Sequence, residues 1–417
     1  MTRASIVSIG NELLSGQTVS TNGSYLGSRL LSIGVPVIST YIIGDDVDSI
    51  VRSLNLAAGD ADVVIATGGL GPTDDDLTRQ AFAKFLGAEL QLQDELLQEM
   101  QSFFKNRNRQ MPETNKVQAY IPAGANALTN NIGTAPGIMA EAKGKLLIAL
   151  PGVPAEMKQM FEQSVLPELQ KLPERQAVVV RKLKCFGTGE SNIAELLSAG
   201  CLSAGPLMQR GRNPLINCTA EYGVITLTII ATARDPEQAR QMAEEDEESL
   251  RSILGDLIYG TGEQTLAEVV GQKLAHQKKT IAVAESCTGG CLAKLLTDIP
   301  GASRYFTQGW ITYSNAAKTA DLGVPSDLIE KHGAVSEQVA QAMAQGARRT
   351  AKTDFAIGIT GIAGPTGASE QKPVGLVYIS VDSMSGCGTK RLVLPGDRAT
   401  IRLRAAQTAL NMVRLKL

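Results

Sequence analysis

Histidine, tryptophan and net charge are all scarce in this chain of 417 residues. It has two histidines, His276 and His332, one tryptophan and a formal net charge of −2. Neither histidine lies in a glycine-rich or otherwise site-like segment, so we expect both at the surface. A hydrolytic site must then find its general base among other side chains, and a metal ion would be held mainly by oxygen ligands.

Paired cysteines, a basic stripe and long apolar runs are also missing. The six cysteines are scattered and form no Cys-x-x-Cys pair, which is typical of reduced thiols in the cytoplasm and not of a disulfide framework or a structural zinc site. No apolar run is long enough to cross a bilayer, and no signal peptide is recognisable. We therefore expect a cytoplasmic protein that binds neither nucleic acid nor a membrane.

The length and the order of predicted strands and helices indicate an α/β multidomain protein. Residues 1–172 alternate strand and helix, which predicts a mainly parallel sheet. Residues 173–258 form a smaller α+β unit, whose acidic stretch at 244–248 we interpret as a solvated helix face. Residues 259–417 alternate again, with strands predicted at 280–286, 306–314, 354–361 and 375–383.

The strongest single motif is Ala-Glu-Ser-Cys-Thr-Gly-Gly at residues 284–290. A buried strand leads into Ser286 and two glycines open the next helix, so helix amides beside the hydroxyl can stabilise an oxyanion or hold a phosphate. An ordinary capping residue on a glycine turn accounts for the motif equally well. Cys287 is a rival nucleophile, because thiolates attack amides readily.

A second motif, at residues 310–318, places Tyr313 and Lys318 at the end of a strand and in the first turn of a helix. With histidine scarce, a desolvated lysine is the natural base for a serine nucleophile. Burial lowers the pKa of a lysine toward neutrality, and a nearby tyrosine hydroxyl can relay the proton. A surface lysine and a half-buried tyrosine are the ordinary alternatives.

Two further segments contain polar side chains near glycine turns. Thr360 lies in the glycine-rich segment 358–365, where it could donate to a carbonyl or phosphate oxygen. Lys372 and Arg398 follow this segment, and their cationic side chains could contact an anionic substrate. A tight turn without a ligand, and solvated surface for the two cations, are the ordinary alternatives.

The amino-terminal unit combines glycines with acidic side chains in residues 67–78. The glycines allow backbone amides to approach a phosphate, and three aspartates, Asp74, Asp75 and Asp76, precede the next helix. Helix capping is the ordinary role of such residues. Three adjacent carboxylates nevertheless repel one another unless a cation collects there, so a hard divalent cation such as Mg²⁺ between protein and substrate phosphates would explain the combination.

The carboxy-terminal unit resembles the carboxy-terminal domain of the CinA family. The motifs that carry the resemblance, in the family's order and spacing, are those at 284–290, 299–303, 313–318, 333–348, 358–367, 372–375 and 396–398. The resemblance implies hydrolysis of nicotinamide mononucleotide to nicotinate mononucleotide and ammonia, without a metal or cofactor. It implies Ser286 as nucleophile, Lys318 as base and Tyr313 as its partner. Thr360 and the amides after Ser286 would serve the oxyanion and the substrate. Further candidates for substrate contact are Glu285, Cys287, Thr288, Gly289, Gly290, Gly361, Lys372 and Arg398.

The amino-terminal unit resembles the amino-terminal domain of the same family, which is similar to the molybdopterin-binding MoaB and MogA fold. The resemblance implies a three-layer α/β fold for this unit and for the carboxy-terminal one. The motifs are at 10–16, 68–78, 130–137 and 149–157. The resemblance implies a metal-dependent ADP-ribose pyrophosphatase, with Asp75 and Asp76 as metal ligands. Candidates for substrate contact are Gly68, Gly69, Gly71, Thr73, Asn11 and Glu12. The middle unit looks like the family's KH-type connector, but it lacks a Gly-x-x-Gly loop flanked by basic residues, so we expect no RNA binding. The family also implies a homodimer.

Two other functions remain open at this point. A molybdopterin- or nucleotide-binding protein without hydrolase activity would rest on the amino-terminal motifs, since relatives of that fold bind molybdopterin. It leaves the carboxy-terminal motifs without a role. A non-enzymatic adaptor linked to competence or DNA damage is the second alternative. The near-neutral net charge argues against direct contact of such an adaptor with DNA.

Overall fold

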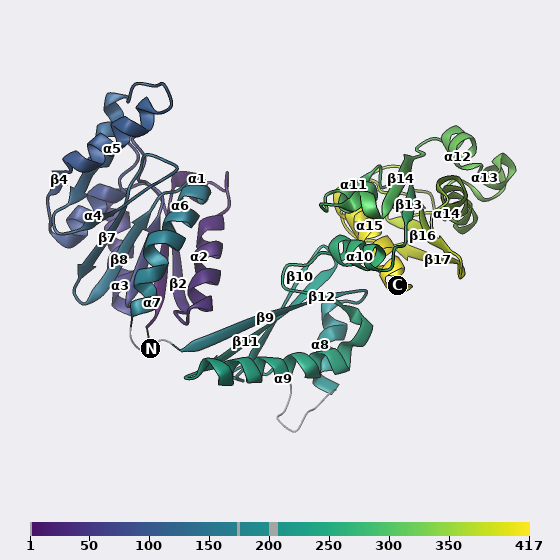
Figure 1. Ribbon diagram of the computed structural model, residues 1–417, viewed down its shortest axis with the longest axis horizontal. Coiled ribbons are helices and arrows are strands. Elements are labelled where there is room, and N and C mark those ends of the chain that lie inside the picture. The colour runs from purple at the N-terminus through teal and green to yellow at the C-terminus, as the bar shows by residue number, and fades with distance from the viewer. Residues whose placement is uncertain (1, 173–175, 200–206) are drawn as a thin grey trace. The chain divides into compact units, whose positions relative to one another are not determined.

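The computed structural model describes residues 2–172, 176–199 and 207–417. Its contacts divide the chain into two compact units, 1–179 with 231–241 and 180–230 with 242–417, which are described one at a time (Figure 1). Of the six cysteines, Cys201 lies outside the described residues. No described helix is long and apolar enough to cross a membrane.

The first unit is built around a six-stranded sheet with the order β2-β1-β3-β8-β7-β6. The four strands β2, β1, β3 and β8 are parallel, and β7 and β6 continue the sheet antiparallel at one edge. The strands of this unit are β1 (Ala4–Ile9), β2 (Val37–Ile43), β3 (Val63–Thr67), β4 (Leu90–Leu92), β5 (Tyr120–Pro122), β6 (Asn126–Leu128), β7 (Gly137–Ala142) and β8 (Lys145–Leu150).

Helices cover both faces of this sheet, because alternate residues of each strand point to opposite sides. Val7 and Ile9 pack against α3 and α4, whereas Ala4 and Ile6 pack against α2, α6 and α7. The result is the predicted three-layer arrangement. The helices are α1 (Asn11–Leu14), α2 (Thr21–Ser32), α3 (Val47–Asp60), α4 (Thr78–Leu86), α5 (Asp94–Lys105), α6 (Pro154–Met160) and α7 (Leu166–Lys171), with a 3₁₀ turn (Glu113–Ala119) and a π-helical turn (Phe161–Val165).

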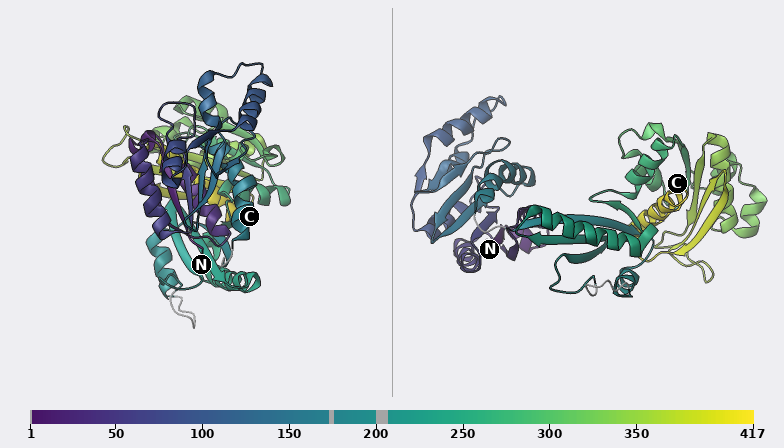
Figure 2. Two further views of the ribbon diagram at one scale, coloured as in Figure 1. Left: turned by 90° about the vertical axis from the view of Figure 1, so that its left-hand side faces the viewer. Right: turned by 60° about the horizontal axis from the view of Figure 1, so that its bottom comes forward.

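The middle segment has a four-stranded sheet with the order β10-β11-β9-β12. Its long helix α9 runs along the sheet (Figure 2). The acidic stretch of this helix is not fully solvated as predicted: Asp246 is 4% exposed and forms an ion pair with Arg212, because a buried carboxylate needs a cationic partner. The elements are β9 (Ala177–Phe186), β10 (Leu215–Glu221), β11 (Val224–Ala233), β12 (Ile258–Thr261), α8 (Glu190–Ala199) and α9 (Pro236–Leu254), with a 3₁₀ turn (Gly255–Leu257).

The carboxy-terminal segment contains a five-stranded sheet with the order β14-β13-β15-β16-β17. Strands β14, β13 and β15 are parallel, and β16 and β17 are antiparallel. The strands are β13 (Ile281–Glu285), β14 (Phe306–Ile311), β15 (Phe355–Gly361), β16 (Leu376–Ser383) and β17 (Gly386–Val393). The helices are α10 (Leu266–His276), α11 (Cys291–Thr297), α12 (Asn315–Leu322), α13 (Ser326–His332), α14 (Glu337–Ala351) and α15 (Arg398–Arg414), with a 3₁₀ turn (Ala302–Arg304).

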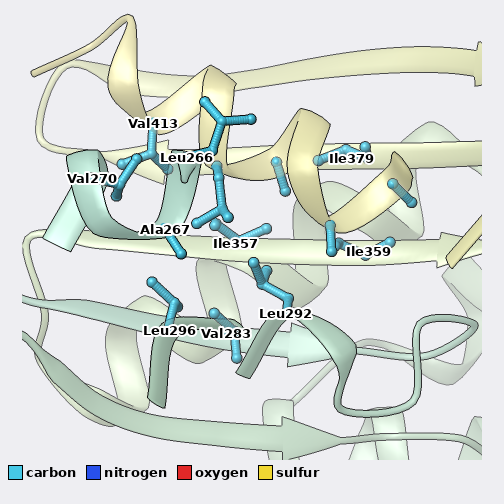
Figure 3. Close-up of a cluster of buried hydrophobic side chains, with 14 of the residues drawn as sticks. Leu266, Ala267, Val270, Val283, Leu292, Leu296, Ile357, Ile359, Ile379 and Val413 are labelled. Atoms are coloured by element: carbon cyan, nitrogen blue, oxygen red, sulfur yellow. The ribbon is translucent and has the colours of Figure 1, made fainter. Parts of the chain in front are cut away.

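The two faces of this sheet are also covered by different helices. Figure 3 shows side chains of α10, α11 and α15, among them Val270, Leu292 and Val413, packed against β13 and β15. On the opposite face, Ala282 and Ala284 pack with residues of α14. Because the carboxyl ends of the parallel strands β13, β14 and β15 lie at one edge, the residues that follow these strands are brought together there.

Candidate active site

Ser286 and Lys318 meet at the carboxyl edge of the second sheet. Ser286 follows β13, and Lys318 lies in the first turn of α12, which begins after the N-cap Ser314. The Nζ atom of Lys318 is 3.1 Å from Oγ of Ser286, and it donates a hydrogen bond of 2.9 Å to the carbonyl oxygen of Thr312. Ser286 is 9% exposed and Lys318 only 1%. The residues predicted as nucleophile and base thus share one buried contact.

The environment of Lys318 favours its neutral form. Burial lowers the pKa of Lys318 below the usual value of a lysine, since desolvation penalises the ammonium more than the amine. Within the described residues no carboxylate forms an ion pair or hydrogen bond with Nζ. A neutral amine has two N–H donors and one lone pair, so with one N–H directed to Thr312, the lone pair can accept the hydroxyl proton of Ser286.

Cys287, the rival nucleophile, lies in a setting that suppresses its reactivity. Its side chain is 7% exposed, and burial raises the pKa of the thiol to about 12. A thiol with that pKa carries almost no thiolate at neutral pH, and the thiolate is the nucleophilic form. The geometry therefore favours Ser286.

Glu285 is fully buried beneath the serine turn. Its carboxylate accepts hydrogen bonds from the backbone amides of Gly290 (3.0 Å), Leu292 (3.1 Å) and Ala293 (2.8 Å). Both oxygens are occupied at the start of α11, where a negative charge also interacts favourably with the helix dipole. Glu285 was predicted to contact substrate, and the structure places it instead where it fixes the turn.

The turn after Ser286 leaves two backbone amides free. The amide of Gly289 donates to the carbonyl of Ser286 (3.1 Å), and the amide of Cys291 donates to that of Thr288 (3.2 Å). Within the described residues, the amides of Cys287 and Thr288 donate to no acceptor on another residue. Gly289 and Gly290 have φ values of 56° and 92°, a conformation that favours glycine. The two free amides directly after the nucleophile are the candidates for an oxyanion hole.

Tyr313 and Arg398 contact each other at the exposed side of the site. Tyr313 is 64% exposed, and its hydroxyl accepts a hydrogen bond of 3.1 Å from Nη2 of Arg398. Nη1 of the same arginine donates to the carbonyl of Gly364 (2.7 Å). No hydrogen bond joins Tyr313 to Lys318 in the described part of the chain. The direct tyrosine–lysine contact that was predicted is thus replaced by a tyrosine–arginine contact.

Thr360 and Lys372 both bind the loop that follows α13. The hydroxyl of Thr360 donates to the carbonyl of Ala334 (2.7 Å), and Nζ of Lys372 donates to the carbonyls of His332 (3.0 Å) and Val335 (2.8 Å). Lys372 was expected to meet an anionic substrate, but its hydrogen bonds hold backbone carbonyls. Gly361 ends β15, where an added Cβ would lie 2.6 Å from the carbonyl oxygen of Leu376.

Sequence analysis missed Arg402, which lies one helical turn after Arg398 on α15. Its Nε and Nη2 atoms donate to the carbonyl oxygen of Thr288 at 2.9 and 2.7 Å. The spacing of the two arginines is the signal that could have identified it, because residues four apart share a helix face. Thr312 was also not predicted; like Thr288, it is fully buried, and its hydroxyl has no hydrogen-bond partner among the described residues.

A second candidate site lies in the first unit, where a cavity of about 400 Å³ opens at the carboxyl ends of the parallel strands. The two motifs that line it, after β1 and after β3, are those that sequence analysis singled out. The predicted residues among its lining are Glu12, Gly68, Gly69, Gly71, Thr73, Asp75 and Asp76. Asn11 is not part of the lining, and its backbone amide donates to the carboxylate of Asp45 (2.8 Å).

Five carboxylates of the first unit line this cavity, those of Glu12, Asp45, Asp75, Asp76 and Glu156. Burial raises the pKa of Asp45, and the negative charges of Glu12, Asp75 and Asp76 raise it further. Asp76 accepts a hydrogen bond of 2.9 Å from the amide of Thr73, and α4 begins without a side-chain cap, so the aspartates do not have the capping role that was their ordinary alternative. Asp45 was not identified from the sequence.

A buried cation lies directly under the glycine loop of this site. Arg79 is 1% exposed and donates to the carbonyls of Leu70 (2.6 Å) and Gly71 (2.7 Å). Burial lowers the pKa of its guanidinium to about 10, so it remains charged at neutral pH. Its hydrogen bonds fix the loop that carries the predicted phosphate-binding glycines.

Two of the predicted residues in this cavity, Asp75 and Asp76, are candidate ligands for a hard divalent cation. Among the described residues, no group of three or more His, Cys, Asp or Glu side chains is placed to hold an ion. Mg²⁺ is commonly bound by one or two carboxylates together with waters and substrate phosphates. Asp75 and Asp76 line the cavity and would supply those carboxylates.

Comparison with known proteins assigns all three parts of the chain. The model described as CinA C-terminal domain matches residues 263–417, the one described as Probable molybdopterin binding domain matches 5–171, and the one described as Damage-inducible protein CinA KH domain matches 180–260. These matches confirm the predicted multidomain α/β fold with a MoaB-like first domain and a KH-like connector. The boundaries at 172 and 258 stay predictions.

Similar proteins extend over the whole chain. A putative competence-damage inducible protein of Caldicellulosiruptor saccharolyticus is 42% identical over 411 residues, which is 99% of this chain and 98% of that protein. A CinA-like protein of Kosmotoga olearia is 43% identical over 99% of this chain and 98% of its own length. The crystal structure of a competence/damage inducible protein from Agrobacterium tumefaciens is 40% identical, covers 35% of this chain and 90% of that chain, and has a TM-score of 0.35. The chain belongs to the CinA family of competence-damage inducible proteins.

Proposed function

We propose that the carboxy-terminal domain hydrolyses the carboxamide of nicotinamide mononucleotide to nicotinate mononucleotide and ammonia. The observation that supports this most directly is the contact of 3.1 Å between Nζ of Lys318 and Oγ of Ser286, in a setting where Lys318 is 1% exposed. An amine held uncharged beside a hydroxyl is the arrangement that general-base activation of serine requires.

In the first half of the reaction, Ser286 attacks the carboxamide carbon while its proton passes to Lys318. The carbonyl of Thr312 holds the amine in place through one N–H. The negative charge that develops on the carboxamide oxygen is stabilised by the free amides of Cys287 and Thr288. Lys318, now an ammonium, returns the proton to the leaving nitrogen, and ammonia departs to give an ester on Ser286.

In the second half, water replaces ammonia. Lys318 accepts a proton from the water, which attacks the ester carbon, and then protonates Oγ of Ser286 as it leaves. The net reaction consumes one water and one carboxamide and gives one carboxylate and one ammonium ion. Arg398, cationic and exposed at the mouth of the site, is placed to attract the phosphate of the mononucleotide.

The decisive experiment measures ammonia release from nicotinamide mononucleotide by the full-length protein, with and without a chelator. The proposal predicts chelator-insensitive release that Ser286→Ala abolishes. Absence of release by the wild-type chain, or full activity of Ser286→Ala, contradicts it and favours the alternative of a nucleotide-binding protein or adaptor without hydrolase activity.

We further propose that the amino-terminal domain cleaves ADP-ribose to AMP and ribose 5-phosphate with one water. The cavity of about 400 Å³ between the glycine loop and the carboxylates supports this, because the backbone amides of residues 69–71 suit the pyrophosphate. A divalent cation at Asp75 and Asp76 would neutralise the phosphates and polarise the bond that breaks. AMP release that a chelator blocks and that excess Mg²⁺ restores is the expected result.

Two aspects of the family resemblance complete the proposal. We expect a homodimer in the cytoplasm, whose ligands are nicotinamide mononucleotide and ADP-ribose, with no nucleic acid and no membrane among its partners. Sedimentation of the full-length protein with and without the two nucleotides measures the oligomeric state, and a monomer under both conditions contradicts the expectation.

A further inference from the structure

Arg402 holds the outer side of the serine turn. Its guanidinium is half-buried, and Nη2 lies 2.7 Å from the carbonyl oxygen of Thr288 and 3.4 Å from that of Gly289. Nε reaches the Thr288 oxygen as well, at 2.9 Å. Two consecutive carbonyl groups therefore point to one cation, in hydrogen bonds that the charge strengthens. Nothing else about Arg402 connects it to the reacting atoms.

The other side of the same two peptide groups is held by residues that come before the turn. The amide of Gly289 donates to the Ser286 carbonyl, and the amide of Gly290 donates to Glu285. Each peptide group is thus fixed at both ends, with its carbonyl toward Arg402. In the described part of the chain, the amides of this turn without an acceptor on another residue are those of Cys287 and Thr288, one step earlier.

The turn needs such a restraint because of its glycines. Gly289 and Gly290 both have positive φ, and a residue without Cβ adopts several backbone conformations at similar energy. A turn that contains two of them can rotate its peptide groups unless hydrogen bonds select one arrangement. A rotated peptide group would direct a carbonyl oxygen, a repulsive group, toward a developing oxyanion.

We propose that Arg402 is a positioning residue, which acts through the carbonyls of Thr288 and Gly289 to keep the free amides of Cys287 and Thr288 arranged for the oxyanion. The inference rests on the proposed deamidation. It separates Arg402 from Arg398, which contacts Tyr313 and Gly364 at the mouth of the site. Arg398 is placed to affect substrate binding, whereas Arg402 is placed to affect the transition state alone.

The test compares steady-state ammonia release by wild type, Arg402→Gln, Arg402→Lys and the control Arg404→Gln, which removes an arginine two residues further along the same helix. We expect kcat of Arg402→Gln to fall by about 10- to 100-fold, less than loss of a direct oxyanion donor, with KM within about threefold of wild type. The inhibition constant of nicotinate mononucleotide should not change, because its planar carboxylate does not resemble the tetrahedral intermediate. Arg402→Lys should recover part of kcat, since an ammonium reaches one carbonyl but does not bridge two.

Several outcomes would overturn the inference. A kcat of Arg402→Gln within about threefold of wild type, or a loss that Arg404→Gln shares, shows that the contact with the turn does not matter. A rise in KM at constant kcat assigns Arg402 to substrate binding. If wild type is inactive on nicotinamide mononucleotide, the proposed function fails and this inference fails with it. The wild-type assay thus tests the proposed function, and the variants then test the role of Arg402.

Discussion

The two candidate sites of this chain differ in how complete they are. At the carboxy-terminal site, nucleophile, base and free amides all come from the protein, and Lys318 already contacts Ser286. At the amino-terminal site, five carboxylates line one cavity, and burial and the charges of three of them raise the pKa of Asp45. The first site favours the uncharged form of Lys318 by burial, whereas the second collects like charges that a bound cation would balance. On our proposal, the first site is preorganised and the second is completed by a divalent cation and the substrate.

The largest effect is expected from removing the hydroxyl of Ser286, which should affect the carboxy-terminal site alone. Ser286→Ala should reduce ammonia release by about 10⁴-fold or more, because no other group can form the ester, and should leave AMP release from ADP-ribose unchanged. Both products can be measured on one preparation. Cys287→Ala serves as the comparison variant, with at least about a tenth of wild-type activity expected; if it is inactive while Ser286→Ala is active, the assignment of the nucleophile is wrong.

A smaller loss is expected from removing the base. Lys318→Met should lower kcat for deamidation by about 10² to 10⁴-fold, the range of general-base catalysis, and Lys318→Arg should be no better because an arginine does not give up its proton. In the wild type, kcat/KM should rise with pH through the lowered pKa of Lys318. A rate that falls over that range, or an active Lys318→Arg, contradicts the role of the lysine as base.

The same lysine should also make the stability of the fold depend on pH. Its pKa is lowered in the folded state, so between that value and about 10.4, the value of an unfolded lysine, the unfolded chain binds more protons and stability increases with pH. Lys318→Met removes this term and should flatten the dependence of the free energy of unfolding on pH. Denaturant unfolding of the second unit at several pH values measures it, and equal slopes for the two proteins contradict the prediction.

At the amino-terminal site, AMP release should depend on the carboxylate of Asp75 and not on that of its neighbour Asp74. Asp75→Asn should reduce AMP release by about 100-fold at fixed Mg²⁺, with ammonia release unaffected, since Asp75 lines the cavity. Asp74→Asn is a matched control, because Asp74 is exposed and outside that lining. We expect it to stay within about threefold of wild type. Equal losses of AMP release in both variants would show that negative charge near the loop supports activity, and would contradict a specific role of Asp75 as metal ligand.

The smallest effect concerns the repulsion at Asp45. Mg²⁺ should raise the melting temperature of the wild-type first unit by a few degrees, equivalent to about 1 kcal/mol, and should raise that of Asp45→Asn by less. Because the pKa of Asp45 is raised in the fold, wild type should also gain stability as the pH falls through that pKa, a gain that Asp45→Asn lacks. An equal rise in melting temperature with Mg²⁺ in both proteins would show that Asp45 does not take part in binding the cation.

The sequence predicted the parts of the fold and of the site that depend on local pattern. The buried strand before Ser286, the glycine turn and the first turn of α12 are local features, and the structure places Ser286 beside Lys318. β10 (Leu215–Glu221) and β17 (Gly386–Val393) were not predicted, and both lie at sheet edges, where one-sided burial weakens the hydrophobic pattern.

Roles that depend on which hydrogen bonds form across the fold were not visible in the sequence. Glu285 and Lys372 occupy motif positions, yet their polar atoms bind backbone amides and carbonyls. Arg402 acts on a turn more than one hundred residues earlier in the chain, at 286–290. Asp45 acquires its importance from carboxylates of other loops. Such contacts are set by tertiary packing, and composition or periodicity does not reveal them.

The central claim is that Lys318 is uncharged when it meets Ser286. Its most direct test is the pKa of Lys318 in the full-length protein, measured by NMR titration of the lysine side chains with Lys318→Arg to assign the signal. We expect one resonance to titrate well below the usual value of a lysine and to vanish in the variant. If Lys318 titrates at or above that usual value, it is an ammonium at neutral pH and cannot be the base.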